Sequence, residues 1–455
     1  MTPPRFLARV MWFRNPTQMC RGRFPMSFGM IRLSILGGML VLMAGCGGSG
    51  GSTGGNGSGG GTGGDGTGGG GTPTTVTYTF TGGTPTAVAT QIGTGAYTQA
   101  SLQSGVLTLS IPSGTTNYSV AYTCPLGITD SANFYGEYVI DASIEDGTSI
   151  RTGGCAGSGS GAGTTMGMAT LQVNAAAIPG TAYVSVGQSG QSWSGNTLSI
   201  SSEMVVGISD VIVCALDSNW KILAVRILRS QTIPGALNGG NPVVLGASDE
   251  TVPQTVTYKN LPAGFSAPVT SVEYLTAGGA GLNLDPDETT QYSDVPSGAV
   301  QRGDSYVFSA EAESATTSGE VVSITQPSSN GGPQIFNLPS PWSYAGPTAA
   351  TLPTFNFDYS GFSGMPSVRE SASIAWTQEM WTLYSIHISA TSKFQNGATT
   401  LAVPDLSGLT GFIAPAPSGT SIFWIAAINQ GVSLTGSQSS TTQSSVQNSG
   451  TYSEP

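Results

Sequence analysis

This sequence contains few of the residues on which most enzymes depend. Its 455 residues include one histidine, five cysteines and 14 Lys and Arg against 25 Asp and Glu. A Ser/His/Asp triad would have to use the single histidine, His387, and a transition-metal site would have one imidazole and scattered thiols. His387 lies in an alternating segment, 384–389, which is typical of a strand. We therefore expect a structural histidine and a protein that is not an enzyme.

The apolar segment 33–44 is too short for a permanent membrane span, but its length suits the apolar region of a signal peptide. It ends in Leu42-Met43-Ala44-Gly45-Cys46. This ending resembles a bacterial lipobox, although Met43 departs from the usual residue at its position. The resemblance implies that Cys46 is diacylated, carries palmitate-type chains and becomes the mature N-terminus. A plain cleaved signal peptide and an ordinary buried segment are the alternatives.

The residues before Cys46 form a leader, 1–45. Residues 1–25 hold five arginines and no acidic residue, and a start at Met26 or Met30 would give a conventional signal peptide. The alternative is a basic arm that binds nucleic acid. Six of the 14 basic residues precede Cys46 and no acidic residue does, so the mature chain keeps eight basic and 25 acidic residues, a net charge of −17. Such a surface repels nucleic acid and anionic lipid headgroups.

Low-complexity segments flank the body of the protein. Residues 47–74 contain 17 glycines in 28 positions, and the segment 46–74 is predicted to be a flexible tether spanning about 30 Å. Gly47, rather than an aspartate, follows the cysteine, which favours the outer membrane, in a periplasmic or surface-exposed position. The Ser-, Thr- and Gln-rich segment 433–455 is predicted to be a disordered tail.

The body, residues 75–432, is predicted to be all-β. Short runs such as 75–80, 106–111 and 118–122 alternate β-branched or aromatic residues with polar ones, between turns rich in glycine and proline. The segment 371–384 also fits a helix, but its Ile374 and Trp376 equally fit strands. This pattern predicts two or more β-sandwich (Ig-like) domains, with regions 75–238 and 239–432 divided at the loop 233–242.

Three cysteines lie in the body. Cys124 ends the strand 118–123, and a meander through 134–143 and 148–154 would bring Cys155 to the same end. Because the protein is exported to an oxidising compartment, we predict a Cys124–Cys155 disulfide. Cys214 lies in the apolar run 211–216 and is predicted to be a buried core residue.

Acidic residues are the remaining candidates for chemistry. Asp285, Asp287 and Glu288 concentrate carboxylates in one loop that could bind Ca²⁺, but the loop lacks the EF-hand spacing, and a solvated acidic loop is the alternative. No other cofactor is expected. A glycosidase would need two facing carboxylates, and the sequence offers Glu137, Glu273, Glu311 and Glu313 without pairing them. Glu311 and Glu313 are predicted to share one face of a strand.

Aromatic residues concentrate in 336–424. Trp342 and Tyr344, in a loop flanked by Pro341 and Pro347, are candidates for an exposed platform that stacks on sugar rings. The alternative is that the aromatic rings fill the core of a domain rich in glycine and serine.

Together these features predict a lipid-anchored protein of the cell envelope whose β-sandwiches serve adhesion, recognition or envelope structure. Its partners would be the membrane, through the anchor, and a glycan or an envelope protein, but not nucleic acid. A carbohydrate-binding surface protein and a secreted glycoside hydrolase that uses paired carboxylates are the alternatives.

Overall fold

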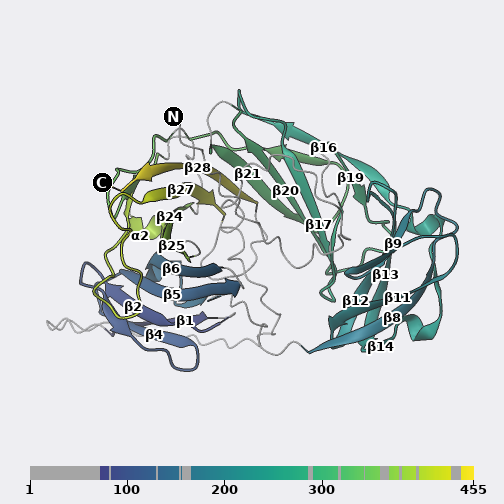
Figure 1. The fold of residues 1–455 in the computed structure, drawn as a ribbon, viewed down its shortest axis with the longest axis horizontal. Helices are drawn as coiled ribbons and strands as arrows, with labels where there is room; N and C mark the ends of the chain where they lie inside the picture. The colour runs from purple at the N-terminus through teal and green to yellow at the C-terminus, as the bar shows by residue number, and fades with distance from the viewer. Residues whose placement is uncertain are drawn as a thin grey trace, which may run out of the picture. The chain divides into compact units, whose positions relative to one another are not determined.

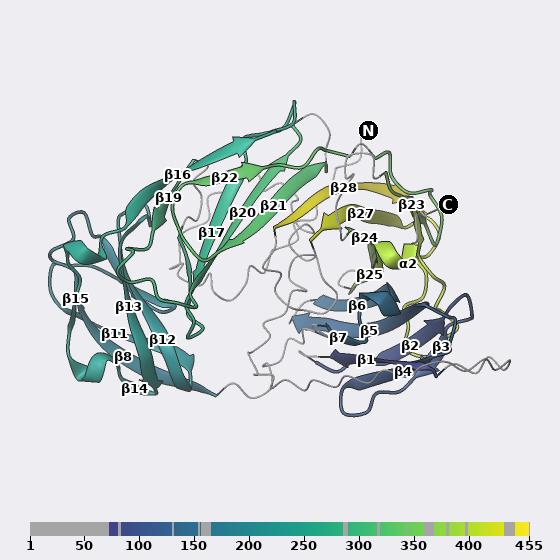
Figure 2. The same cartoon turned by 180° about the vertical axis from the view of Figure 1, so that it is seen from behind.

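The structure is a computed structural model (Figures 1 and 2). It describes residues 72–80, 83–129, 132–152, 155, 165–284, 290–315, 319–342, 344–358, 368–378, 382–395, 399–431 and 442–454. These residues form strands β1 to β28, three short 3₁₀ turns and one short helix, so the predicted all-β fold is confirmed.

The described residues group into two compact units that are discontinuous in sequence. The first unit contains residues 165–341, and the second contains 72–155 and 342–431 together with most of the last strand. The predicted division at 238/239 therefore does not separate the units. The cause is a long-range strand pairing in the second unit, where β6 (Ala132–Ser143) lies parallel to β25 (Thr382–Thr391).

The first half of the first unit is a sandwich built around the core residues Leu171, Val184 and Val213. One sheet runs β10-β9-β12-β13, and the other runs β11-β8-β14 with β15 also paired to β8. The bounds are β8 Met166–Asn174, β9 Tyr183–Val186, β10 Ser189–Ser192, β11 Leu198–Val205, β12 Gly207–Leu216, β13 Ile222–Ile233, β14 Gly235–Ala236 and β15 Val243–Val244. The turns Leu237–Gly240 and Ala247–Asp249 complete this half.

The second half of this unit has the strand orders β19-β16-β22 and β18-β17-β20-β21. Tyr274, Tyr306 and Phe308 are buried in it. The bounds are β16 Val252–Lys259, β17 Val269–Leu275, β18 Gly281–Asn283, β19 Gln291–Asp294, β20 Ser305–Glu313, β21 Val321–Ser328 and β22 Gln334–Asn337.

The second unit contains a long central sheet, in the order β3-β2-β5-β6-β25-β24-β27-β28, with a smaller sheet β4-β1-β7 and the pair β23-β26. Its N-terminal bounds are β1 Thr74–Phe80, β2 Ala87–Ile92, β3 Thr98–Ala100, β4 Val106–Ile111, β5 Asn117–Thr129, β6 Ala132–Ser143, the turn Ile144–Asp146 and β7 Ser149–Thr152. Its C-terminal bounds are β23 Thr354–Asn356, β24 Val368–Gln378, β25 Thr382–Thr391, α2 Ser392–Gln395, β26 Thr400–Ala402, β27 Ser421–Gln430 and β28 Gln443–Ser453. The segment 371–384 is thus strand wherever it is described.

Strand β28 corrects the prediction of a disordered tail. It lies next to β27 in the sheet order, near the labelled C-terminus (Figure 1). Val446 and Asn448 are buried, and the Asn448 amide donates a hydrogen bond to the backbone carbonyl of Trp342. A polar, Ser- and Gln-rich composition does not prevent strand formation once a neighbouring strand supplies the backbone hydrogen bonds.

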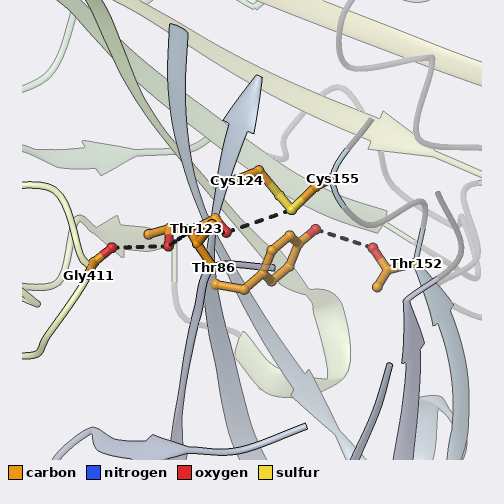
Figure 3. Close-up of a disulfide and its surroundings, with 7 residues drawn as sticks. Thr86, Thr123, Cys124, Thr152, Cys155 and Gly411 are labelled. Carbon is orange, nitrogen blue, oxygen red and sulfur yellow. Dashed lines mark hydrogen bonds between the residues drawn. A yellow bond between two sulfur atoms is a disulfide. The ribbon is translucent and has the colours of Figure 1, made fainter. Parts of the chain in front are cut away.

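The predicted disulfide is confirmed, with the Cα atoms of Cys124 and Cys155 5.1 Å apart (Figure 3). The predicted path to it is wrong, because β7 does not return to the sheet of β5 but pairs with β1 in the smaller sheet. The disulfide therefore joins the two sheets of one sandwich. Tyr122 and Thr152 join the same sheets through a hydroxyl–hydroxyl contact of 3.2 Å.

Candidate functional site

One face of the central sheet in the second unit carries a row of polar side chains. The backbone register places Gln91 opposite Ser119, and Ser119 opposite Asp141. Asp141 in turn lies beside Ala390, which lies opposite Glu370. Directly paired residues point to the same face of a sheet. We call these five residues the carboxylate row.

The carboxylate row holds two acids on either side of a small residue. Strands lie about 4.8 Å apart, so the Cα atoms of Asp141 and Glu370 are about 10 Å apart across Ala390. Burial raises the pKa of Glu370 to about 7, although a hydrogen bond from the Gln395 amide of 2.5 Å works against the increase. Burial likewise raises the pKa of Asp141 to about 6, opposed by a hydrogen bond from Ser119. Both acids therefore hold protons more tightly than acids in water.

A third acid, Glu137, shares this face four residues before Asp141 on β6. Its carboxylate accepts a hydrogen bond of 3.1 Å from the backbone N–H of Ile413, and only 1% of the residue is exposed. Burial raises the pKa of Glu137 to about 7. Glu137 thus holds the loop that precedes β27 against the sheet.

Beyond the carboxylate row, the same face ends at a small polar hollow. Asn117 and Ser143 form the next pair along the strands, two residues from Ser119 and Asp141. With them, Thr116, Glu145, Ser392 and Lys393 line a hollow of about 330 Å³. Asn117 donates a hydrogen bond to the carbonyl of Phe394, and Lys393 donates one to the carbonyl of Glu145. These contacts hold α2 over the end of the sheet.

The opposite face of the sheet carries the single histidine. Its ring stacks on Tyr138 with centroids 4.9 Å apart, and Tyr138 stacks on Tyr122. The His387 Nε2 lies 3.1 Å from the hydroxyl of Ser385. Burial lowers the pKa of His387 to about 4, so the ring is neutral at pH 7. Among the described residues no carboxylate hydrogen-bonds this ring, so the third member of a catalytic triad is not assembled there.

A different buried cluster lies in the first unit, centred on Arg229. Its guanidinium donates hydrogen bonds to Asp210 at 2.8 Å, to both carboxylate oxygens of Asp304 at 2.6 and 3.0 Å, and to the carbonyl of Ala299. Burial favours the neutral acid, but hydrogen bonds from Arg229, Tyr274 and the backbone prevail and lower the pKa of Asp304. Asp210 and Arg229 belong to the first half of the unit and Asp304 to the second. The cluster therefore clamps the two halves together.

Of the predicted aromatic platform, Trp342 is buried and Tyr344 is only partly exposed. Only 5% of Trp342 is accessible, and its ring stacks on Tyr344 and Phe357 at 4.7 and 5.3 Å. Tyr344 contacts the edge of Trp424 and accepts a hydrogen bond from the backbone N–H of Asn356. A ring covered on its faces cannot stack on a sugar, so Trp342 corrects the platform prediction. These rings pack on one another in the core, as the alternative prediction stated.

Other candidates of the sequence are placed as follows. Cys46 and the acidic residues Asp285, Asp287 and Glu288 lie outside the described residues, so lipidation and calcium binding stay predictions. Glu311 and Glu313 share the exposed face of β20, as predicted. Cys214 is buried in β12, as predicted. Across the ranges that the structure describes, no three His, Cys, Asp or Glu side chains gather as metal ligands.

Sequence reasoning named Glu137 but missed Asp141, Glu370 and Arg229. Asp141 and Glu370 are 229 positions apart along the chain, and only the pairing of β6 with β25 and β25 with β24 brings them into one row. The available signal was local: Glu370 is the only acid of β24, and Asp141 follows the apolar run 138–140 of β6.

No helix among the described residues is long and apolar enough to span a membrane. Neither a protein-family model nor a curated protein matches this chain.

Proposed function

We propose that the protein is a lipid-anchored component of the cell envelope that displays rigid β-sandwich units for recognition or envelope structure, without catalysis. The lipobox-like ending at Cys46 supports the anchor, and the glycine-rich segment after it supports a tether.

The contacts of the buried acids support the proposal that the protein does not catalyse a reaction. Glu137 holds the Ile413 loop, Glu370 holds Gln395 of α2, and Asp304 holds Arg229 across two halves of a unit. Glu137 and Glu370 are each only 1% exposed. A glycosidase acid must touch the glycosidic oxygen or the sugar carbon, so it has to be open to a polymer. These acids serve the fold instead.

Lipidation is tested by labelling cells with an alkyne analogue of palmitate and measuring incorporation into the purified protein. Cys46→Ser should abolish the label and release the protein from the membrane fraction. Cys20→Ser is the matched control, because Cys20 lies in the leader and its loss should change neither result. Mass spectrometry that finds an unmodified Cys46, or residues 1–25 retained, would contradict the anchor.

The absence of catalysis is tested by incubating the purified protein with a panel of plant, fungal and bacterial polysaccharides. We expect no release of reducing ends above that of a heat-denatured sample. Release that disappears in Glu370→Gln and Asp141→Asn would instead establish the hydrolase alternative and identify its acids.

A further inference from the structure

Three aromatic side chains form a stacked ladder on the face of the central sheet that carries the carboxylate row. The backbone register places Trp376 of β24 opposite Tyr384 of β25, and Tyr384 beside Tyr135 of β6. The Trp376 and Tyr384 rings stack with centroids 5.8 Å apart, and the Tyr384 and Tyr135 rings with centroids 5.5 Å apart. The planes differ by only 20° and 16°, so each ring covers a face of the next. We call these three residues the aromatic ladder.

The aromatic ladder opens to solvent at its Tyr135 end. Only 2% of Trp376 is exposed and Tyr384 is half-buried, whereas 43% of Tyr135 is exposed. Tyr135 is therefore unlike the buried Trp342, which stacks on two rings. Among the described residues Tyr135 stacks on one ring only, and the exposed part of its own ring is available to a ligand.

Polar side chains continue the same face beyond the aromatic ladder. Gln378 lies two residues after Trp376, Thr382 lies two residues before Tyr384, and the register pairs Gln378 with Thr382. Residues two apart on a strand share a face and lie about 7 Å apart, so an amide and a hydroxyl stand next to the rings. Gln378 is exposed and Thr382 is half-buried. Hydrogen-bonding groups therefore border the stacked rings.

We propose that the Tyr135 end of the aromatic ladder, with Gln378 and Thr382 beside it, binds a pyranose ring of a polysaccharide. A pyranose ring with equatorial substituents has an apolar face of axial C–H bonds and a polar rim. The apolar face packs on an aromatic ring, and the hydroxyls of the rim form hydrogen bonds with an amide or a hydroxyl. A nucleic-acid base would also stack on tyrosine, but this chain has a net charge of −11 and repels the phosphates.

This inference names the ligand for the recognition part of the proposed function and rests on that part alone. It depends on neither the lipid anchor nor the absence of catalysis. Binding is measured in solution, whereas lipidation of Cys46 is measured by incorporation of the label, so the two proposals can fail separately.

Isothermal titration calorimetry of the purified protein with cellohexaose and with chitohexaose tests the inference. Both oligosaccharides consist of β-linked pyranose rings with equatorial substituents. We expect saturable binding of at least one of them. Sorbitol, an open-chain polyol that has hydroxyls but no ring face, should not bind at the same concentration. Absence of saturable binding of both oligosaccharides, or equally tight binding of sorbitol, would overturn the proposal.

Variants of Tyr135 test the position of the site. Tyr135→Ala removes the exposed ring and should weaken binding about tenfold, because stacking is the principal contact. Tyr135→Phe keeps the ring and should bind within about twofold of the wild type, since the ring face rather than the hydroxyl makes that contact. Tyr183→Ala is the matched control, because Tyr183 is a half-buried tyrosine of the first unit that also stacks on a ring, that of Trp220. It should leave binding unchanged.

The melting temperature of each variant, measured in parallel, separates loss of binding from loss of the fold. If Tyr135→Ala does not fold, Gln378→Ala changes an exposed residue and should weaken binding about threefold through the lost hydrogen bond. Unchanged binding in the folded variant, whether Tyr135→Ala or its substitute Gln378→Ala, would overturn the proposal. Equal weakening by Tyr183→Ala would overturn it as well.

Discussion

The two units bury charge in opposite ways. In the first unit, Arg229 and its aspartates lie in contact, and the side chain of Asp304 is 0% exposed. In the second unit, Glu370 and Glu137 are buried on one face of a sheet while Arg369 lies on the other face. The pKa values follow this arrangement: that of Asp304 falls, and those of Glu370 and Glu137 rise.

The difference shows that the sheet of the second unit keeps the cation on one face away from the acids on the other face. Side chains at neighbouring positions of a strand point to opposite faces, so Arg369 and Glu370 are adjacent in sequence and yet face different surroundings. In the Arg229 cluster, the interacting side chains come from the two halves of the first unit and contact one another directly. Burial alone therefore does not determine the protonation state; the presence of a partner does.

The largest expected effect comes from removing the central cation of the first unit. Arg229→Met leaves Asp210 and Asp304 buried without their counter-charge, and should lower the free energy of unfolding by about 3–5 kcal/mol. Urea denaturation followed by circular dichroism measures it. Arg226→Met is the control, because the Arg226–Asp249 pair is more exposed and should contribute about 1 kcal/mol or less. Equal losses in the two variants would show that burial of the pair is unimportant.

The second effect concerns pH. The folded state holds the Glu370 proton up to about pH 7, whereas the unfolded chain releases it near 4.5, so the contribution of Glu370 to stability falls as the pH rises through this window. Glu370→Gln cannot ionise, and should gain up to about 3 kcal/mol over the wild type between pH 4 and pH 8. Asp304 acts in the opposite sense, since its lowered pKa makes stability fall as the pH drops below 3.8.

Denaturation curves at several pH values measure this prediction. Ser392→Ala, at an exposed residue of α2, is the control and should retain the pH dependence of the wild type. If the difference between Glu370→Gln and the wild type does not change with pH, folding does not raise the pKa of Glu370, and the contrast between the two units fails.

The smallest effect tests the contact that partly compensates Glu370. Gln395→Ala removes the amide that donates to the carboxylate, and should raise the pKa of Glu370 further and cost about 1 kcal/mol. Carbon-13 NMR titration of labelled glutamate follows the pKa, and thermal unfolding follows the stability. A lower pKa in the variant would mean that Gln395 does not donate to this carboxylate.

Local features were predictable from the sequence. Strands appear at 75–80, 106–111 and 118–122 because alternation is a property of each segment alone. The Cys124–Cys155 pairing was also predicted correctly, although its path runs through the other sheet. Strand β28 was missed because its composition is polar and its hydrogen-bond partners lie elsewhere in the chain.

The sequence by itself determined that the body is all-β, since the two-residue period and the turn residues act within a few positions. It also determined the candidate leader and tether, which depend on composition and local order. Only the tertiary structure decided which strands pair, and hence that Trp342 is buried and that Asp141 and Glu370 share a row. The physical reason is that pairing between distant strands sets both the face on which a side chain lies and the charges it meets there.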